Sequence, residues 1–526
     1  MSYALGIELS TQSAKMVVLD AEHGTVIYTG GFTYEREFPK YGTVNGVLPS
    51  PDASVRHTSP AMLIEALDRV FSMLKKDGVD CTKIAAIKAD AMQHCTVYAD
   101  ASLAQRLRAI DPAHDLVTAL SPSLSRKTAP IWEDRSTGTE TAFIEQSVKK
   151  GVVNVTGNRA ELRFPLAQIM KWGRENPAEY AATAHIMLLS AYLTSILCGK
   201  ISPVDTGDGW GTNLNTVNIG HPDFSGDMIA VADRYINVCG KDSVKRKIGG
   251  MAHFDAPAGK INPYFTVKHG VPASAKILVG TGDNPATLLG CGGNIVISLG
   301  SSYTVNGIMR RVKPSAAGEY NVFGYTKGTA IALSCFTNGG KLHETFARRY
   351  ITPDAAANLT SADWDRYRDA CGAPLLSVDE RLMLPYLMDE SVPVRKAGII
   401  REGFSEDSPE NIRALHVSQA LAMKVHSAHL SDVDEICVVG GGARNVFLRQ
   451  VISDMFNAKT YTIRNADVAA AFGCAISAAR VISGISYEAA FERYLQKDAA
   501  SALLPTGNEH VVARLIERYS GLEGRA

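Results

Sequence analysis

A single acid directly after a glycine-rich turn is the clearest candidate for chemistry in this sequence of 526 residues. The apolar run 276–279 predicts a buried strand, Asp283 follows it between Gly282 and Asn284, and 286–289 indicates the start of a helix. This order places the Asp283 carboxylate at the carboxyl end of a strand, where open α/β sheets bind ligands. Glycine lets other groups approach the acid closely. We therefore interpret Asp283 as a candidate catalytic base.

Two predicted hairpins carry small hydroxylic residues in their turns. Residues 6–15 run strand, turn and strand, with the turn at 10–13, and residues 297–305 repeat the pattern with a turn at 300–302. Such turns can offer N–H groups and hydroxyls to phosphate oxygens. The same residues are also ordinary turn formers. Because each half of the chain has one such hairpin, and a glycine run at 440–442 joins a strand to a helix, a split nucleotide site is the favoured interpretation.

The elements that must position these residues alternate between strands and helices, which predicts an α/β protein. Short turns between the opening strands predict an antiparallel meander, followed by an irregular loop over 33–60. The predicted strands are 3–9, 15–19, 25–32, 84–88, 277–279, 294–299, 302–309 and 435–439. The predicted helices are 60–76, 138–150, 165–175, 186–198, a helical pattern over 408–430, and a helix from about 445.

Composition limits the class of protein. A chain of 526 residues is too long for one core, which favours two to four domains. Lys plus Arg and Asp plus Glu number 54 each, so net charge does not point to nucleic acid or an anionic membrane. Nine scattered cysteines without a CxxC pair favour reduced thiols in a cytosolic protein. The longest apolar stretch, 186–198, contains Ser190, Thr194 and Ser195 and is too short to span a bilayer. We expect a cytoplasmic protein with no nucleic-acid or membrane partner.

Taken in order, these motifs resemble the FGGY carbohydrate kinases, which belong to the superfamily of actin, hexokinase and the heat-shock chaperone ATPase. The resemblance covers nearly the whole chain and is carried by 6–15, Gln93-His94, 282–284, 298–302 and 440–445. Several stretches are most similar to the xylulose kinases of this family, especially the animal ones. These stretches are 38–43, 156–164, 202–205 and 281–286.

The resemblance implies two ribonuclease-H-like α/β domains with a cleft between them, in which ATP and a sugar meet. It places a sugar-binding domain with the first phosphate hairpin at 1–260 and a nucleotide-binding domain at 261–526, whose last helices can pack back on the first. The implied reaction is ATP-dependent phosphorylation of the terminal hydroxyl of D-xylulose, giving D-xylulose 5-phosphate and ADP.

The resemblance also implies roles for the sugar-site residues. Asp283 would accept the proton of the attacking hydroxyl, a contribution of typically ~10²–10⁴-fold. An amide and an imidazole supply donors and acceptors for a polyol, and an arginine fork can hold two hydroxyls. The implied substrate-binding residues are Gln93, His94, Arg163, Asp283 and Asn284. Ala91-Met92 and Cys95 stand where the family pattern has glycines around the Gln-His pair, and Asp134 falls where the family has an acid that is either a sugar contact or structural.

On the nucleotide side, the resemblance implies ATP-binding residues in the two turns and the glycine run: Ser10, Thr11, Gln12, Gly300, Ser301, Ser302, Gly441 and Asn445. Most of the family has Asp in the first hairpin, where this chain has Glu8. The acid there is expected to hold Mg²⁺, which takes one or two carboxylates and keeps several waters. Glutamate is one methylene longer and could bind the ion more directly or shift it.

Other interpretations remain open at this point. The same chemistry could act on ribulose, gluconate, erythritol or glycerol, because a few pocket side chains read a hydroxyl's stereochemistry. A non-catalytic, actin-like nucleotide-binding protein or a plain ATPase would need no sugar-type Gln93-His94 pair beside an acid. The expected partners are a small sugar and ATP, and a homodimer is one of the oligomeric states that the resemblance allows.

Overall fold

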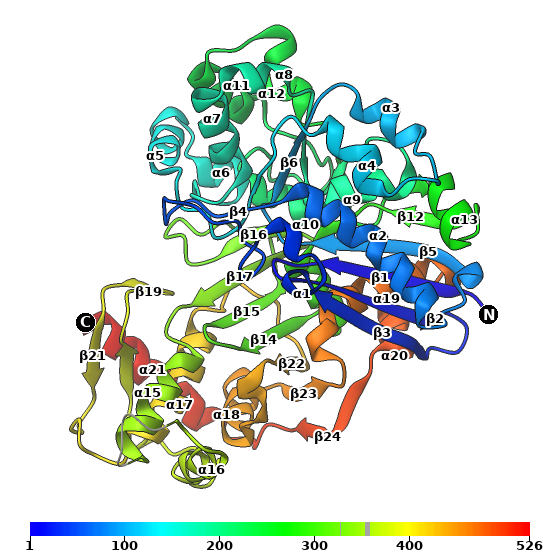
Figure 1. Cartoon of the computed structure of the whole chain (residues 1–526). Helices are drawn as coiled ribbons and strands as arrows, with labels where there is room; N and C mark the ends of the chain where they lie inside the picture. Colours follow the sequence, from blue (N-terminus) through cyan, green and yellow to red (C-terminus); the bar gives the residue numbers. More distant parts are fainter. Residues whose placement is uncertain (327, 353–357, 526) are drawn as a thin grey trace. The chain divides into compact units, whose positions relative to one another are not determined.

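The computed structural model describes residues 1–326, 328–352 and 358–525, and the described chain is an α/β protein (Figure 1). Its contacts divide it into two compact units. Unit 1 comprises Met1–Gly290, Val322–Ile331 and Asp467–Leu495, and unit 2 comprises Cys291–Asn321, Ala332–Ala466 and Gln496–Ala526. The predicted segments 1–260 and 261–526 do not coincide with these units, because strands after residue 260 still join the first sheet and a late helical segment packs on it.

Unit 1 is built on a sheet with the order β11-β12-β5-β1-β2-β3, with β13 also pairing β5. The three opening strands are antiparallel to one another, as the predicted meander requires, and β5 is parallel to β1. The strands are β1 (Tyr3–Leu9), β2 (Ser13–Asp20), β3 (Val26–Thr33), β5 (Ile84–Ala91), β11 (Pro257–Lys260), β12 (Lys276–Leu278) and β13 (Thr281–Gly282). Because β5, β12 and β13 run parallel, their carboxyl ends share one edge of the sheet.

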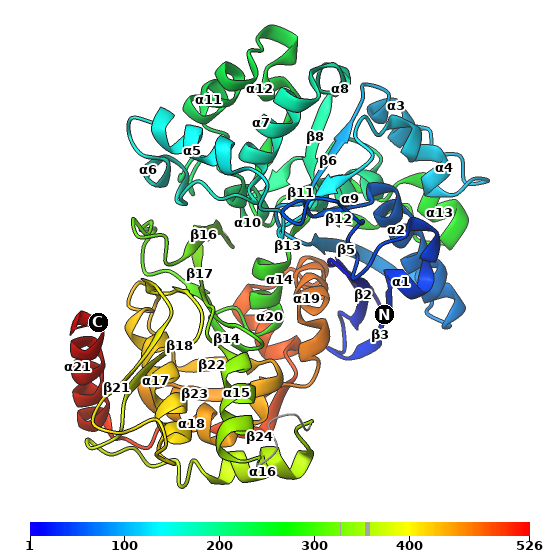
Figure 2. The same cartoon turned by 60° about the vertical axis from the view of Figure 1, so that its left-hand side comes forward.

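Helices cover both faces of this sheet. Leu5 and Ile7 of β1 share a core with helix α2 (Pro60–Lys76), whereas Ala4 shares another core with helix α19 (Ala469–Ser483). All seven residues of β1 are therefore buried, as expected for a strand packed on both faces. Figures 1 and 2 show α2 and α19 beside this sheet.

Helix α19 meets helix α14 (Asp283–Gly290) and β1 at backbone distance. A Cβ placed on Gly6 would lie 1.9 Å from the Ala471 carbonyl oxygen, and one on Gly290 would lie 1.9 Å from that of Ala469. A Cβ on Gly473 would lie 2.0 Å from the Ala286 carbonyl oxygen. No side chain fits at these three glycines, so the packing of α14 against the sheet depends on them.

Most predicted elements of unit 1 are present, with two corrections. The apolar stretch 186–198 is a strand and then a helix, β8 (His185–Leu188) and α9 (Leu189–Cys198). The loop predicted over 33–60 contains the short helices α1 (Tyr34–Glu37) and η1 (Pro39–Tyr41). A continuous apolar run has no period that separates strand from helix, which explains the first error.

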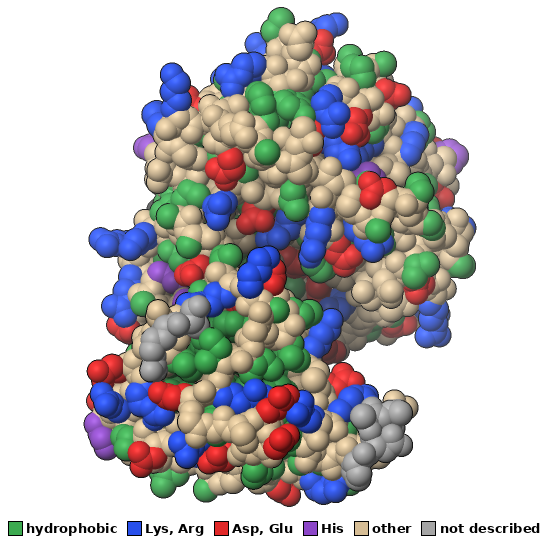
Figure 3. Space-filling view, turned by 90° about the vertical axis from the view of Figure 1, so that its left-hand side faces the viewer, with side chains coloured by type: hydrophobic (Ala, Val, Ile, Leu, Met, Phe, Trp, Pro, Cys, Tyr) green, Lys and Arg blue, Asp and Glu red, His purple; other side chains and the backbone are tan. Residues whose placement is uncertain are grey.

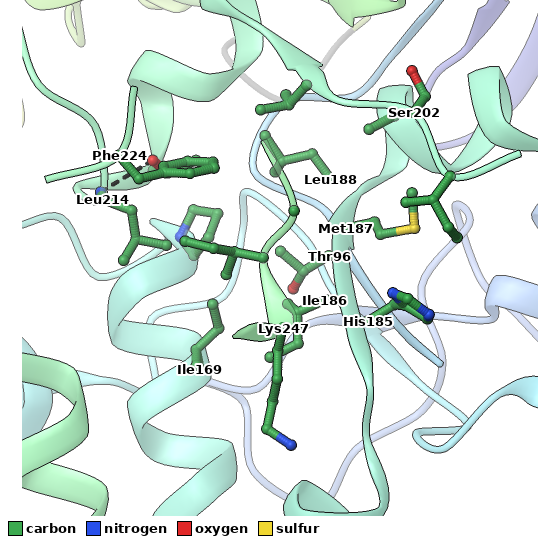
Figure 4. A pocket seen from close by; sticks show the side chains of 17 residues that line it. Thr96, Ile169, His185, Ile186, Met187, Leu188, Ser202, Leu214, Phe224 and Lys247 are labelled. Carbon is green, nitrogen blue, oxygen red and sulfur yellow. Dashed lines mark hydrogen bonds between the residues drawn. The ribbon is translucent and has the colours of Figure 1, made fainter. Parts of the chain in front are cut away.

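A second core of unit 1 lies around α5 (Gly138–Ser147), α7 (Pro165–Glu175) and α11 (Gly226–Ile236). Beside it, α7, β8 and the short helix α12 (Val244–Lys247) line an apolar cavity of about 30 Å³ (Figure 4). The Lys247 stem lines this cavity, while its ammonium donates to the carbonyls of Tyr180 and Thr183. This volume has room for little more than a water molecule and is too small for a substrate.

Unit 2 contains a sheet in which β17-β15-β14-β22-β23-β24 are neighbours in that order. Its strands are β14 (Ile295–Leu299), β15 (Tyr303–Ile308), β17 (Ala330–Phe336), β22 (Glu435–Val439), β23 (Lys459–Ile463) and β24 (Lys497–Leu503). Its main helices are α15 (Gly340–Tyr350), α16 (Ser361–Asp369), α17 (Asn411–Val425), α18 (Val446–Phe456) and α21 (Glu509–Arg525). The second predicted hairpin is β14 and β15, and β22 has the predicted bounds.

One apolar helical segment of the described chain, 466–483, is long enough to cross a membrane, but two thirds of it is buried and α19 belongs to the core of unit 1. On the face shown in Figure 3, Lys and Arg side chains are mixed with Asp and Glu side chains rather than gathered by sign. All nine cysteines are free thiols.

Candidate active site

Asp283 is the first residue of α14 and follows β13 directly. The predicted strand, glycine, acid and helix order is therefore present. A Cβ on Gly282 would lie 2.4 Å from the Gln93 side chain, so the glycine is needed for Gln93 to approach the acid. The Asp283 side chain is half-buried and remains reachable from solvent.

The pKa of Asp283 suits a catalytic base. Desolvation, followed by repulsion from Glu8, raises the pKa of Asp283 to about 7. Hydrogen bonds from the backbone N–H groups of Gln93 and Asn284 act in the opposite direction, because they favour the carboxylate. A base works best when its pKa is near the working pH. Near neutrality Asp283 can thus hold and release a proton.

Two further acids lie on adjacent strands beneath Asp283. Glu8 on β1 is the register partner of Asp90 on β5, and Asp90 is in turn the partner of Thr281 on β13. Burial raises the pKa of both acids, and the charge of Glu8 adds to the rise at Asp90. Lys15 contacts Glu8 at 3.3 Å, whereas Asp90 Oδ1 has no hydrogen-bond partner among the described residues. Ionisation of these carboxyls is therefore disfavoured unless a cation offsets their charge.

Gln93 hydrogen-bonds to two segments beside the candidate base, the start of α14 and the turn at Gly207. Its Oε1 accepts a hydrogen bond from Asn284 Nδ2 at 2.7 Å, and its Nε2 donates to the Gly207 carbonyl at 3.1 Å. Asn284 Nδ2 also lies 3.2 Å from Asp283 Oδ1. The structure thus brings together the predicted residues Gln93, Asp283 and Asn284, with much of the Gln93 amide used to orient its neighbours.

His94 adopts a left-handed backbone conformation, with φ of 68°, where non-glycine residues are uncommon. Its Nδ1 donates to the Gly211 carbonyl at 2.8 Å, which leaves Nε2 as the acceptor of the neutral ring. Its ring stacks on Phe164 with centroids 4.5 Å apart. Burial, followed by the Arg163 charge, lowers the pKa of His94 to about 3, so the ring stays neutral. A strained, oriented, neutral imidazole fits a hydroxyl-binding role.

Arg163 lies in the turn before α7, not on a helix, and its guanidinium is about one-third exposed. It contacts Glu161 at 3.7 Å and is close enough to His94 to influence its charge. Asp134, by contrast, is fully buried and accepts hydrogen bonds from Arg56, Ser136 and Gln168. These bonds support the structural interpretation of Asp134.

A buried turn with two acids, Asp205 and Asp208, supports the loop that carries Gln93 and His94 and the turn that carries Asp283. Sequence reasoning did not assign these acids to the site. Helix α10 (Thr206–Gly209) begins after Asp205, whose Oδ1 accepts from the Asp208 N–H at 2.8 Å. Burial raises the pKa of Asp205 to about 7 and that of Asp208 further, with Asp205 and Asp283 repelling the Asp208 charge. Nearby, fully buried Lys88 donates to the Val279 and Phe254 carbonyls at 2.8 and 2.9 Å, which fixes the chain just before Gly280.

The first predicted phosphate turn, Ser10–Gln12, lies between β1 and β2. Ser10 closes it with its N–H and Oγ on the Ser13 carbonyl, both at 2.9 Å. Gln12 is exposed, and Thr11 Oγ1 accepts a hydrogen bond from the indole of Trp132 at 2.9 Å. Sequence reasoning missed Trp132, although a tryptophan with 46% exposure is unusual enough to mark a site.

In unit 2, a pocket of about 780 Å³ contains four of the predicted ATP-binding residues: Gly300, Ser301, Gly441 and Asn445. Ser302, the remaining ATP-binding residue predicted in unit 2, lies in the same turn as Gly300 and Ser301 and packs against Gly339. The N-terminus of α15 lies on this turn, because the Gly340 N–H donates to the Gly300 carbonyl at 3.0 Å. The volume is that of a typical ligand pocket, and a helix N-terminus favours anions.

The wall of this pocket combines aromatic rings with charged side chains, namely Lys341, Glu344, Arg368 and Arg444. Tyr303, Trp364 and Tyr367 line it together with His343. Asn445 caps α18 through Oδ1, on the Leu448 N–H, and its Nδ2 lies 2.9 Å from Nε2 of His416. Burial lowers the pKa of His416 to about 4, so His416 is a neutral acceptor. The rings suit a flat base, and the basic side chains suit phosphate groups.

The described residues contain no group of three or more His, Cys, Asp or Glu side chains arranged to hold a metal. The predicted metal residue Glu8 has a second carboxylate, Asp90, as its strand neighbour. Asp90 was missed because it follows the predicted strand 84–88, whereas β5 continues to Ala91, and nothing local shows that its carboxylate is buried.

Comparisons with known proteins agree with this geometry. Residues 296–482 match the C-terminal domain of the FGGY family of carbohydrate kinases. The xylulose kinase of Mus musculus is 29% identical over 544 aligned positions, covering 99% of this chain and 94% of that protein. The xylulose kinase of Schizosaccharomyces pombe is also 29% identical, covering 94% of this chain and 92% of its own length.

Solved structures give the same fold at low identity. A xylulose kinase from Rhodospirillum rubrum superposes with a TM-score of 0.78 at 16% identity, covering 99% of this chain and 98% of that one. Plasmodium falciparum glycerol kinase with ADP gives 0.74 at 13% identity, with 99% and 98% covered. The predicted α/β class is confirmed, and the fold is that of these sugar kinases. The match of residues 296–482 to the FGGY C-terminal domain and the similarity to xylulose kinases along nearly the whole chain confirm the predicted resemblance.

Proposed function

We propose that this protein is an ATP-dependent sugar kinase that phosphorylates the terminal hydroxyl of D-xylulose and releases D-xylulose 5-phosphate and ADP. The observation that carries the proposal is Asp283, a half-buried carboxylate with a pKa of about 7 beside Gln93 and Asn284. Full-length similarity to xylulose kinases supports the choice of sugar.

In the proposed reaction, the sugar lies against His94, Arg163 and Asn284, and Asp283 accepts the proton of the terminal hydroxyl as its oxygen attacks the γ-phosphorus. The bond from that phosphorus to the β,γ-bridging oxygen breaks, and ADP leaves. His94 accepts a hydrogen bond from a second hydroxyl through Nε2. Much of the remaining rate enhancement comes from positioning and charge neutralisation.

The nucleotide is proposed to bind in the pocket of unit 2, with its base against Trp364 and Tyr367 and its phosphates toward Gly300 and Ser301. The turn Ser10–Gln12 of unit 1 stays a prediction as a second phosphate-binding element. Its exposed Gln12 and the hydroxyl of Thr11 are compatible with that role.

We propose that Mg²⁺ accompanies ATP and that Glu8 and Asp90 hold it, in part through water. The unpartnered Oδ1 of Asp90 and the raised pKa values of both acids fit a cation at this edge. When bound, the ion would neutralise phosphate charge, and a divalent cation would also offset the repulsion between the two carboxylates.

A coupled assay of ADP release tests the function. D-xylulose, ribulose, gluconate, erythritol and glycerol are compared at equal ATP, and D-xylulose is expected to give the highest kcat/KM. The fold does not choose among these sugars, since xylulose and glycerol kinases share it. ADP release that no sugar stimulates would indicate a plain ATPase, and nucleotide binding without ADP release would indicate a sensor or assembly protein.

We also infer a reducing, cytoplasmic location. The nine free cysteines support it, because none is paired and three of the six buried thiols, those of Cys81, Cys95 and Cys474, lie in hydrophobic cores. We expect the protein purified without reductant to keep its activity and, after unfolding, to show nine titratable thiols.

A further inference from the structure

Helix α9 carries buried hydroxyls that the proposed mechanism does not use. Ser190, Thr194 and Ser195 are all fully buried, although the helix is otherwise apolar. Ser190 and Thr194 are four residues apart and therefore lie on one face of the helix. A buried hydroxyl is costly unless it is hydrogen-bonded, so the partners of these groups show what they do.

Thr194 contacts the turn that ends in the base. Its Oγ1 accepts a hydrogen bond from the Gly280 N–H at 2.9 Å and donates to the Ser190 carbonyl at 2.8 Å. A Cβ on Gly280 would lie 2.7 Å from both the Thr194 oxygen and the Ser190 carbonyl oxygen. The turn that leads into Asp283 is thus pressed against α9, and its buried N–H has Thr194 as acceptor.

Ser190 contacts the other loop of the sugar site. Its Oγ donates to Asp208 Oδ2 at 2.5 Å, and the Asp208 carboxyl faces the backbone N–H of His94. The segment that carries Asp208 also supplies the Gly207 carbonyl to Gln93 and the Gly211 carbonyl to His94. Ser190 therefore supports the Gln93-His94 pair through one intervening side chain.

We propose that Ser190 and Thr194 are positioning residues for the sugar kinase reaction: Thr194 fixes the turn that carries Asp283, and Ser190, through Asp208, fixes the turn that carries His94. This inference rests on the proposed function. It separates two effects, because displacement of a base lowers kcat whereas displacement of a hydroxyl-binding group raises the sugar KM.

The test compares Thr194→Val and Ser190→Ala with a matched control on the same helix. Ser195 is equally buried, but its Oγ bonds the Ala191 carbonyl and the Ser202 N–H, neither of which belongs to the site. Ser195→Ala thus removes a buried hydroxyl of α9 and should leave kcat and both KM values unchanged.

For Thr194→Val we expect kcat to fall about tenfold to a hundredfold, because a displacement of about 1 Å can cost that much, while the sugar KM changes less than about threefold. Thr194→Ser keeps the oxygen and should recover most of kcat. For Ser190→Ala we expect the sugar KM to rise about three- to tenfold, the effect of one net hydrogen bond, with the ATP KM unchanged.

Equal kcat values for Thr194→Val and Ser195→Ala, or a Thr194→Ser variant as slow as Thr194→Val, would overturn the proposal. Melting temperatures are measured for every variant, and kinetic losses that simply follow melting temperature also count against it. If Thr194→Val does not fold, Ser190→Ala decides, and a sugar KM equal to that of Ser195→Ala refutes the inference. A wild-type protein without sugar-stimulated turnover would instead refute the proposed function.

Discussion

In unit 1, the acids Glu8, Asp90 and Asp283 lie on neighbouring elements, burial raises the pKa of each, and the charge of Glu8 adds to the rise at Asp90 and Asp283. In unit 2, the pocket around Gly441 is lined by glycines, aromatic rings and charged side chains, and the histidine behind Asn445 is held neutral by burial. In the first region burial and Glu8 disfavour charged carboxylates, whereas the wall of the second carries more basic than acidic side chains. Under the proposed function, proton transfer and sugar recognition depend on side chains of unit 1, and nucleotide recognition on the glycines, rings and basic side chains of unit 2.

The largest effect is expected for Asp283→Ala. Removal of the base should lower kcat by about 10²–10⁴-fold, because a positioned carboxylate contributes that much to proton transfer. Calorimetric titration with ATP and with D-xylulose should still show binding, since the unit 2 pocket is untouched. Near-normal turnover would mean that the acids of unit 1 do not perform the chemistry.

His94→Asn tests sugar recognition in the same unit. Asparagine tolerates a positive φ, so the turn can keep its path while the ring acceptor and the stack on Phe164 are lost. The sugar KM should rise about tenfold to a hundredfold, the cost of about 1.5–3 kcal/mol of binding. An ATP KM that rises as much would break the division between the two regions.

The pH dependence of kcat/KM reports the charge on Asp283 directly. Only the carboxylate can accept a proton, so with a pKa of about 7 kcat/KM should be half-maximal near pH 7 and about tenfold below the plateau at pH 6. Initial rates at low D-xylulose between pH 5.5 and 8.5 give this profile. A flat profile down to pH 5.5 would show that burial and Glu8 do not raise the pKa of Asp283 in the active protein.

Asn445→Asp is the corresponding change in unit 2. Aspartate keeps the oxygen that caps α18 but loses the N–H group that reaches His416. The ATP KM should rise about three- to tenfold, the effect of one hydrogen bond, with the sugar KM constant. A change confined to the sugar KM would contradict the assignment of this pocket.

The smallest effect concerns stability. The folded pKa of Asp283, about 7, lies above the ordinary value of 3.8, so the native state binds the proton more tightly and loses stability as pH rises from about 4 to 7. Asp283→Asn removes this cost and should raise the melting temperature at pH 8 by on the order of 1 °C or more, with little change at pH 4. An equal shift at both pH values would separate the effect from ionisation.

Sequence patterns predicted the elements around Asp283 well, since β1 has its predicted bounds and the helix predicted from 286 is present, although α14 begins earlier, at Asp283 itself. An apolar run ended by glycine is a strong local signal. Burial of charge is not local: Asp90 and Asp208 are acids like many on the surface, and only the tertiary fold places them under the site. The Arg163 turn and the β8–α9 boundary were equally invisible, because neither has a distinctive period.

The backbone contacts of Gly6, Gly290 and Gly473 carry a consequence for how this enzyme can change. In a library of all single substitutions, these three positions should be almost empty among active clones, while positions around His94 tolerate exchange. Side chains near the sugar can therefore be exchanged, whereas the spacing between the base and the sheet cannot change. Altered sugar preference should arise by reshaping the rim of the site, never by moving the helix that begins at Asp283.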